Sequence, residues 1–512
     1  MKKTLSLALL ALAIVAAPIF AASLESDLTS DRATTTHSSS PAHTTAHTTP
    51  ATPTTHTTPA AHPTHPHPTP APTPAPTPDT SIPLPQPQKD WTFAVYLNAN
   101  NNLDPFSVDN INEMEAIGSG NWLNVVTLLA RQKGTETYNY ITKGAAHMIK
   151  DLGHYDMGDY KHFVEFAQYI VSNFPAKHYA LVIWNHGSGW KLKDSIVTRG
   201  ISYDDSTGNH ITNQQLGMAL HQVKDIIGHN IDIMCYDACL MQMAEVAYEA
   251  QGCVDYVVGS EETEPGKGTP YDAVLKAFCQ SCPVQTNAKA WTKAYIDSYN
   301  HGSHGYEACT QSTLDISKVQ AVFDAMNGFS KAAMAGNYVT EFGVALDKVQ
   351  KYAYPENIDM IHFATLLKSQ SKDEALTTAC DKLIAAAQSC IIANGNMDPK
   401  MANSNGMSVY FPADSTGYEP QYTNLDICKT NMWPQMIQDY YKKKTASKIV
   451  KAVNNGDVTA LRSFVNESKE PEVSKFVADQ MNFQLHTEGA VPAAVFEEAN
   501  SLVKQLTTRQ SR

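Results

Sequence analysis

The sequence predicts an α/β fold in which helices cover both faces of a mostly parallel sheet. Apolar strands alternate with helical segments along the chain, an order typical of parallel sheets. The run 179–184 is apolar throughout, as expected for a strand that is buried on both faces. A chain of 512 residues is also long enough for a large core.

The first 88 residues precede the predicted fold. Residues 1–22 are typical of a signal peptide, because Lys2 and Lys3 come before an apolar run and small residues follow it. Residues 23–88 are rich in Thr, Pro, Ala and His, a composition that favours a solvated, disordered linker. Seven histidines from His37 to His67 could bind metal weakly but lack fixed ligand geometry. No later stretch has the length of a membrane helix, so we expect an exported protein that is secreted, periplasmic or at the cell surface.

The folded region is predicted over residues 89–440. Strands are expected at 91–97, 124–129, 178–184, 231–236 and 256–259, with helices at 107–117, 163–174, 213–227 and 240–250. Mostly helical segments follow to about residue 400, and 406–412 is another apolar strand. Residues 441–512 have helical spacing and are predicted as a small helical C-terminal extension.

The charge and the cysteines narrow the class of protein. A formal net charge of −13 argues against nucleic-acid binding, which needs a basic face. The nine cysteines lie between Cys235 and Cys428, and an odd number leaves at least one unpaired after export. Cys279 and Cys282 form a C-x-x-C pair. A helical stretch before it and Pro283 after it favour a local disulfide or plain packing over a redox role.

A histidine and a cysteine follow two of the predicted strands. His186 comes after the strand at 178–184, and Cys239 comes after the strand at 231–236. One helix separates these strands, so we expect them to be neighbours with both residues at the ligand-binding edge of the sheet. A histidine can accept the proton of a thiol and later protonate a leaving amine. Each residue taken alone has a simpler interpretation, as packing or as a turn.

Two features around the pair suit acyl transfer. A helix predicted to start just after Cys239 would favour negative charge on its sulfur. Gly187 follows the histidine directly, and a glycine lets backbone N–H groups approach a substrate oxygen. The N–H groups of Gly187 and Cys239 are therefore candidates for an oxyanion hole.

These residues and their surroundings resemble the clostripain family of cysteine peptidases, relatives of caspases, legumains and gingipains. The resemblance covers roughly residues 90–440, and its histidine and cysteine blocks have the spacing of that clan. The blocks that resemble the family are 96–103, 184–190, 237–241, 256–266 and 406–412.

The resemblance implies a caspase-like α/β/α sandwich and an endopeptidase in which His186 is the base and Cys239 the nucleophile. It also implies that Asp237 shapes the pocket for the residue before the scissile bond. Strand alternation independently puts 237 and 239 on the same side, where an acid would attract Arg or Lys. Asp237 could instead stabilise a turn. Glu261, Glu262 or Glu264 could complete the pocket, with Glu262 and Glu264 as our candidates.

Relatives mature by cleavage between the histidine and cysteine blocks. This chain offers Lys191, Lys193 and Arg199 there, and Arg199 and Lys193 are the candidate self-cleavage sites. The chain departs from the family at Asn100 and Ala130, where an acid is common. Some relatives depend on calcium, but no contiguous loop has calcium-ligand spacing; the chemistry requires no cofactor, and calcium remains an open expectation.

The sequence therefore favours an exported cysteine endopeptidase that cleaves peptides and proteins after Arg or Lys through a thioester. The main alternative is a stalked surface binding or adhesion protein with an inactive peptidase fold, which the linker and the C-terminal extension would suit. A metal hydrolase is disfavoured, because the sequence has no H-E-x-x-H pattern or compact ligand cluster.

Overall fold

The computed structural model describes residues 77–190, 200–467, 471–487 and 493–509. The described part of the predicted linker, residues 77–88, contacts the folded domain. The Asp79 backbone N–H donates to the Met148 carbonyl at 2.7 Å, and the Asp79 carboxylate meets His147 at 2.8 Å. The ordered domain therefore begins about ten residues before the predicted boundary. None of the helices in the described ranges is long and apolar enough to cross a bilayer.

The central sheet has nine strands in the order β14-β12-β9-β8-β5-β1-β2-β3-β4. Its five middle strands are parallel: β1 (Lys89–Ala99), β2 (Leu123–Arg131), β5 (Ala176–Trp184), β8 (Ile231–Asp237) and β9 (Val254–Gly259). These are the five strands that the sequence predicts. The expected α/β class with a mostly parallel sheet is confirmed.

The sequence pattern misses the four outer strands, which are antiparallel to their neighbours. They are β3 (Thr137–Thr142), β4 (Ala145–Asp151), β12 (Cys309–Asp315) and β14 (Ile391–Met397). The last two lie in the stretch predicted as mostly helical. Strand β12 is rich in Thr, Ser and Gln and yet fully buried, so its polarity hides it from a hydrophobic pattern.

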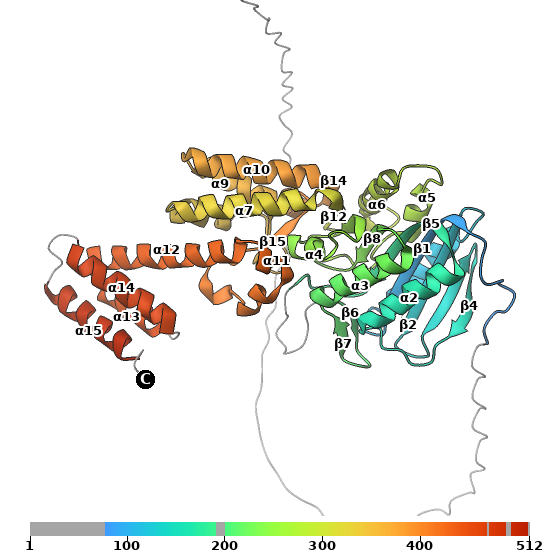
Figure 1. Ribbon diagram of the computed structural model, residues 1–512, viewed down its shortest axis with the longest axis horizontal. Helices are drawn as coiled ribbons and strands as arrows, with labels where there is room; N and C mark the ends of the chain where they lie inside the picture. The colour runs from blue at the N-terminus through green and yellow to red at the C-terminus, as the bar shows by residue number, and fades with distance from the viewer. Residues whose placement is uncertain (1–76, 191–199, 468–470, 488–492, 510–512) are drawn as a thin grey trace, which may run out of the picture. The chain divides into compact units, whose positions relative to one another are not determined.

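Helices cover both faces of the sheet (Figure 1). On one face lie α1 (Asp104–Ile117), α5 (Tyr271–Ala277) and α6 (Val284–Tyr299), which contribute Met114, Val274 and Trp291 to one core. On the other face α2 (Tyr160–Asn173) and α3 (Asn213–Ile227) lie side by side. The sheet and the helices on its two faces together form a three-layer sandwich.

Further helices extend the core that lies on the α2 and α3 face of the sheet, and they pack beyond β9. They are α7 (Val319–Ala335), α8 (Val339–Lys348), α9 (Met360–Gln370), α10 (Glu374–Cys390) and α11 (Asp426–Thr430). The apolar strand predicted at 406–412 is the short strand β15 (Ser408–Tyr410). It pairs with β13 (Asn357–Asp359) and does not join the main sheet. Two further hairpins are β6 (Ile201–Asp204) with β7 (Asn209–Ile211), and β10 (Asn300–Gly302) with β11 (Gly305–Tyr306).

The C-terminal extension is helical, as expected, but its first helix starts inside the main domain. Helix α12 (Trp433–Asn454) runs through the predicted boundary at residue 440. Its first half packs into the main core through Trp433 and Ile437. Its second half forms a separate small core with α13 (Val458–Glu467), α14 (Pro471–Thr487) and α15 (Ala493–Arg509).

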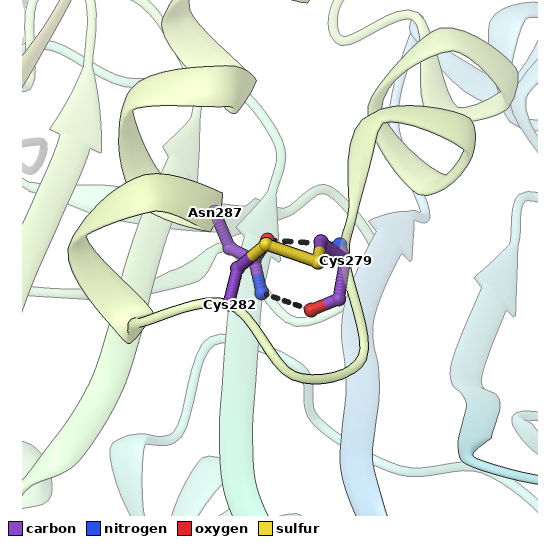
Figure 2. The surroundings of a disulfide bond; sticks show 3 residues. All are labelled: Cys279, Cys282 and Asn287. Carbon is purple, nitrogen blue, oxygen red and sulfur yellow. Dashed lines mark hydrogen bonds between the residues drawn. A yellow bond between two sulfur atoms is a disulfide. The ribbon is translucent and has the colours of Figure 1, made fainter.

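The described cysteines contain one disulfide, between Cys279 and Cys282 (Figure 2). It closes the loop between α5 and α6, where Asn287 holds the backbone of Cys279 by two hydrogen bonds of 2.9 and 3.1 Å. Of the seven other cysteines, only Cys239 is not fully buried. The C-x-x-C pair is thus the local disulfide that the sequence favoured, and Cys239 is the most accessible unpaired thiol of the described residues.

Candidate active site

His186 lies two residues beyond β5, in a loop that its neighbour Asn185 anchors. The Asn185 amide donates to the Asn98 carbonyl at 2.6 Å and accepts from the Tyr203 N–H at 2.7 Å. The His186 Nε2 atom is 2.6 Å from the side-chain oxygen of Asn102. That oxygen can only accept, so in the neutral ring Nε2 holds the proton and Nδ1 is the basic nitrogen.

Cys239 lies two residues beyond β8, in a turn. Its sulfur accepts a hydrogen bond from the Glu264 N–H at 3.3 Å. Burial, and then the charge of Glu264, raise the pKa of the Cys239 thiol to about 12, while the backbone N–H groups of Glu264 and Cys239 oppose the shift. The resting thiol is therefore protonated, and its reaction as a nucleophile needs a base.

The sheet register brings this histidine and this cysteine together. Strands β5 and β8 are parallel neighbours in which Trp184 pairs with Asp237, so His186 and Cys239 each follow a paired position by two residues. Both line one cavity of about 110 Å³. The ends of β5 and β8 are therefore adjacent, as the sequence predicts.

Gly187 makes this close approach possible. A Cβ atom at this position would lie 2.4 Å from the carbonyl oxygen of Cys239 and 3.0 Å from side-chain atoms of Ala238 and Met241. The histidine loop and the cysteine turn therefore touch through a position where no side chain fits.

The helix expected directly after Cys239 begins later. Helix α4 spans Ala244–Glu249, and Leu240 has a φ of 64°. The N–H groups of Leu240 and Gln242 donate to the carbonyls of Glu262 and Ser260, so this segment pairs with another loop and does not coil. The expectation that a helix N-terminus stabilises the thiolate of Cys239 is therefore wrong.

Asp237 forms the inner wall of the cavity. Its side chain is 4% exposed. Its Oδ1 accepts from the Thr269 N–H at 3.0 Å, and its Oδ2 accepts from the Tyr271 hydroxyl at 2.7 Å. Both donors lie at 269–271, where the chain enters α5, so Asp237 ties the end of β8 to that segment.

The structure separates the three glutamates that follow β9. Glu264 lines the cavity beside Asp237. Glu262 faces elsewhere and accepts from the N–H groups of Thr263 and Ala353 at 2.7 and 3.1 Å. Glu261 is buried against Tyr352 and the Gly406 N–H. Of our two candidates, only Glu264 meets the cavity.

The two positions where the chain departs from the family, Asn100 and Ala130, are both buried. The Asn100 amide donates to Asp204 Oδ1 at 2.9 Å, and the Met157 N–H donates to Oδ2 at 3.0 Å. Both oxygens of Asp204 thus accept from protein donors, and the buried side chain of Ala130 has no ligand atom. Across the described ranges, no three His, Cys, Asp or Glu side chains are grouped so that they could hold a metal ion.

Sequence reasoning missed two polar side chains at the site. Asn102, which contacts His186, stands in a run of asparagines after β1 that a pattern cannot separate. Tyr271, which contacts Asp237, starts α5 and is remote in sequence. The candidate cleavage residues Lys193 and Arg199, with Lys191, lie outside the described residues.

A sequence model of the clostripain family matches residues 95–440. The chain is 28% identical over 318 residues to clostripain from Hathewaya histolytica. The aligned region covers 53% of this chain and 60% of that protein. It therefore spans less than two thirds of the length of this relative.

Two solved structures have a similar fold. One is a secreted C11 cysteine protease from Bacteroides thetaiotaomicron in complex with an irreversible peptide inhibitor, at 20% identity and a TM-score of 0.54, covering 68% of this chain and 99% of that one. The other is an inactive zymogen C11 protease from Parabacteroides distasonis, at 19% identity and a TM-score of 0.52, covering 67% of this chain and 98% of that one.

Proposed function

Because the chain belongs to the clostripain family of cysteine peptidases, we propose that it is an exported endopeptidase that cleaves after Arg or Lys. Cys239 is the nucleophile and His186 the base. The observation that carries the proposal is the single cavity lined by His186, Cys239, Asp237 and Glu264. Export rests on the signal-peptide pattern of residues 1–22.

In the proposed reaction, Nδ1 of His186 takes the proton of the Cys239 thiol as the sulfur attacks the scissile carbonyl. The N–H groups of Gly187 and Cys239 receive the negative charge that forms on the substrate oxygen, and one such donor contributes about 3 kcal/mol. The imidazolium then protonates the leaving amine, which leaves a thioester on Cys239. Water, activated by the same histidine, hydrolyses the thioester.

The raised pKa of the thiol is compatible with this sequence of steps. A thiol with a pKa of about 12 does not ionise in the empty site, so its proton moves to His186 as the substrate binds. Asn102 supports the transfer because it keeps the proton of the neutral ring on Nε2.

Preference for a basic residue is supported by the acidity of the cavity. The carboxyl groups of Asp237 and Glu264 lie at one wall, and no Lys or Arg lines the cavity among the described residues. A buried acidic wall without a cation favours a positively charged side chain.

The proposal is tested with reporter peptides that end in Arg, Lys or a neutral residue. We expect turnover of the basic reporters only, and no turnover by Cys239→Ala or His186→Ala. Cys380→Ala is the matched control, since Cys380 is equally an unpaired cysteine but buried in α10. Assays with added calcium and with a chelator measure any dependence on that ion.

The competing function predicts a different outcome. If no reporter is cleaved under reducing conditions with calcium, the stalked binding protein is the better interpretation. Cleavage after neutral residues alone would keep the peptidase and remove the specificity that we assign to the acidic wall.

We also propose self-processing at Arg199 or Lys193. The flanks of this segment are well anchored: Trp190 is buried against Tyr410 and Tyr422, and the Ser188 N–H donates to the Gly200 carbonyl at 3.1 Å. Two fragments should appear on a denaturing gel for the unmodified protein and remain associated in gel filtration. Fragments that persist in Cys239→Ala would rule out self-cleavage as their source.

A further inference from the structure

The loop that follows β9, residues 260–264, holds the segment of the candidate nucleophile. The Glu264 N–H donates to the Cys239 sulfur at 3.3 Å, and the Glu262 carbonyl accepts from the Leu240 N–H at 3.1 Å. Leu240 has a φ of 64°, a left-handed conformation that a residue with a side chain keeps only where its surroundings hold it. The position of Cys239 therefore depends on what anchors residues 260–264.

Glu261, in the middle of this loop, is buried against a second carboxyl group. Glu261 is 1% exposed, and Asp359 is fully buried. The two carboxyl groups are hydrogen-bonded to each other. Glu261 also accepts from the Tyr352 hydroxyl at 2.8 Å and from the Gly406 N–H at 2.9 Å. One side chain thus ties the loop to three segments that are distant in sequence.

The partners of Asp359 decide which carboxyl group holds a proton. Two buried carboxyl groups in contact cannot both ionise without a large cost, so one of them is protonated. Asp359 caps α9, where it accepts from the His362 N–H at 2.6 Å. It also accepts from the side-chain amide and the backbone N–H of Asn405 at 2.9 and 2.5 Å. These donors and the helix N-terminus stabilise a charge on Asp359, so the proton belongs to Glu261, which donates it to Asp359.

Among the described residues, the titratable side chains that act on this pair, or on which it acts, are Tyr352 and His362. Burial lowers the pKa of His362, and its Nδ1 accepts from the Gln350 N–H at 2.9 Å, so the ring is neutral. Burial, and next the charge of Asp359, raise the pKa of Glu261 well above its usual range. The pair therefore carries one negative charge and one proton.

Tyr352 gives the pair a second link to Cys239. The Tyr352 hydroxyl lies 2.8 Å from Glu261 Oε1 and 3.4 Å from Asp359 Oδ2. Its ring packs with Leu240, and Cys239 lies against the same cluster. Ionisation of Glu261 would place two buried negative charges in contact, which would disturb both the loop and this packing.

We propose that Glu261 is a positioning residue for the nucleophile, and that it acts as the protonated member of a carboxyl pair with Asp359. Through residues 260–264 it places the Glu264 N–H against the sulfur of Cys239. This inference rests on the proposed peptidase function and deepens it. The proton stays on Glu261 throughout the reaction, and Glu261 touches neither the substrate nor the reacting atoms.

Kinetics with reporter peptides test the positioning role. Glu261→Ala should lower kcat about 100-fold, because a loop displaced by about 1 Å misplaces the donor to the sulfur, and KM should change less. Glu261→Gln should recover most of the loss, because its neutral amide group can donate to Asp359 and accept from the Gly406 N–H. Asp232→Ala is the matched control. This buried carboxyl group lies at the opposite end of β8 and accepts from the Tyr179 N–H at 2.8 Å, so its loss should cost stability and leave kcat unchanged.

The shared proton gives a readout that a merely structural role would not move. The folded protein keeps a proton on Glu261 that the unfolded chain releases above the usual glutamate pKa of 4.5, so stability falls as pH rises from that value to the folded pKa. The unfolding equilibrium constant in urea should therefore rise with pH more steeply in the unmodified protein than in Glu261→Gln. The difference should be about tenfold per pH unit, the effect of one proton. Equal slopes in the two proteins would overturn the inference.

The two proposals fail in different ways. If reporters are cleaved but Glu261→Ala keeps kcat, or Glu261→Gln is as slow as Glu261→Ala, this inference is wrong and the peptidase stands. If Glu261→Ala does not fold, Glu261→Asp, whose side chain is one methylene shorter, takes its place in the same comparison. If the unmodified enzyme cleaves no reporter, the peptidase proposal fails, and hydrogen exchange at the Leu240 and Glu264 amides decides this inference. Exchange should be faster in Glu261→Ala than in Glu261→Gln, and equal exchange would overturn it.

Discussion

Gly187→Ala places one methyl group between the two halves of the candidate dyad. The new Cβ would lie 2.4 Å from the Cys239 carbonyl oxygen, whereas ordinary contacts begin at 3.4 Å. The histidine loop and the cysteine turn must therefore separate by about 1 Å. A misplacement of about 1 Å near reacting groups costs on the order of 100-fold in rate, and overpacking costs about 1–3 kcal/mol in stability.

The assay compares kcat and KM for an Arg reporter, together with urea unfolding, for Gly187→Ala and the unmodified protein. We expect kcat to fall about 100-fold with a smaller change in KM, because the acidic wall is not displaced. Gly343→Ala is the matched control: this glycine lies in α8, and a Cβ added there would meet nothing within 4 Å, so alanine should stabilise the helix slightly.

A Gly187→Ala enzyme with unchanged kcat and unchanged stability would refute this reasoning. It would mean that the histidine loop moves freely against the cysteine turn. A loss of activity with an equal loss in Gly343→Ala would point to a general intolerance of substitution and would say nothing about the dyad.

Three further predictions concern other parts of the molecule. Asn102→Ala should lower kcat within the roughly 10²- to 10⁴-fold that acid–base catalysis contributes, because His186 loses the acceptor at 2.6 Å that orients its ring. Replacing Cys279 and Cys282 by serine should lower the free energy of unfolding in urea by about 2 kcal/mol, the chain-entropy value for so short a loop, and leave activity intact because Asn287 still holds the loop. Glu249→Gln should flatten the pH dependence of stability. Burial, and then the charge of Asp426, raise the pKa of Glu249 from 4.5 to about 8, so the folded protein loses stability as pH rises through that window and the glutamine variant does not.

Each of these has a contrary result. An unchanged kcat in Asn102→Ala would exclude a role for Asn102 in orienting the ring. A serine double variant that unfolds at the same urea concentration as the unmodified protein would show that the disulfide adds nothing to Asn287. A Glu249→Gln variant whose unfolding free energy falls with pH as steeply as that of the unmodified protein would assign the slope to other groups.

The sequence by itself determined the parallel middle of the sheet and the two residues at its edge. Buried parallel strands are continuous apolar runs, so β1, β2, β5, β8 and β9 stand out from the pattern. Ligands bind beyond the carboxyl ends of such strands, and His186 and Cys239 are the residues with suitable chemistry that follow two of these ends. Their adjacency needed only that β5 and β8 be neighbours, and in the sheet they are.

Tertiary structure alone decided the outer strands and the segment after Cys239. Strand β12 is buried although it is rich in polar residues, and its Ser312 and Thr313 side chains find hydrogen-bond partners across the core, so hydrophobicity does not reveal it. Residues 240–242 have a helical pattern, but their backbone hydrogen bonds go to the loop after β9. Distant partners overrode the local preference in both places.

The composition of the acidic wall was likewise invisible in the sequence. Glu261, Glu262 and Glu264 are nearly equivalent along the chain. The path of their loop decides that Glu261 contacts Tyr352, Glu262 contacts the N–H of Ala353 and Glu264 contacts Asp237. Residue types and strand ends name the candidate chemistry of this protein. Contacts between segments far apart in sequence decide which acid lines the cavity, because a loop has no periodicity from which its side-chain directions could be read.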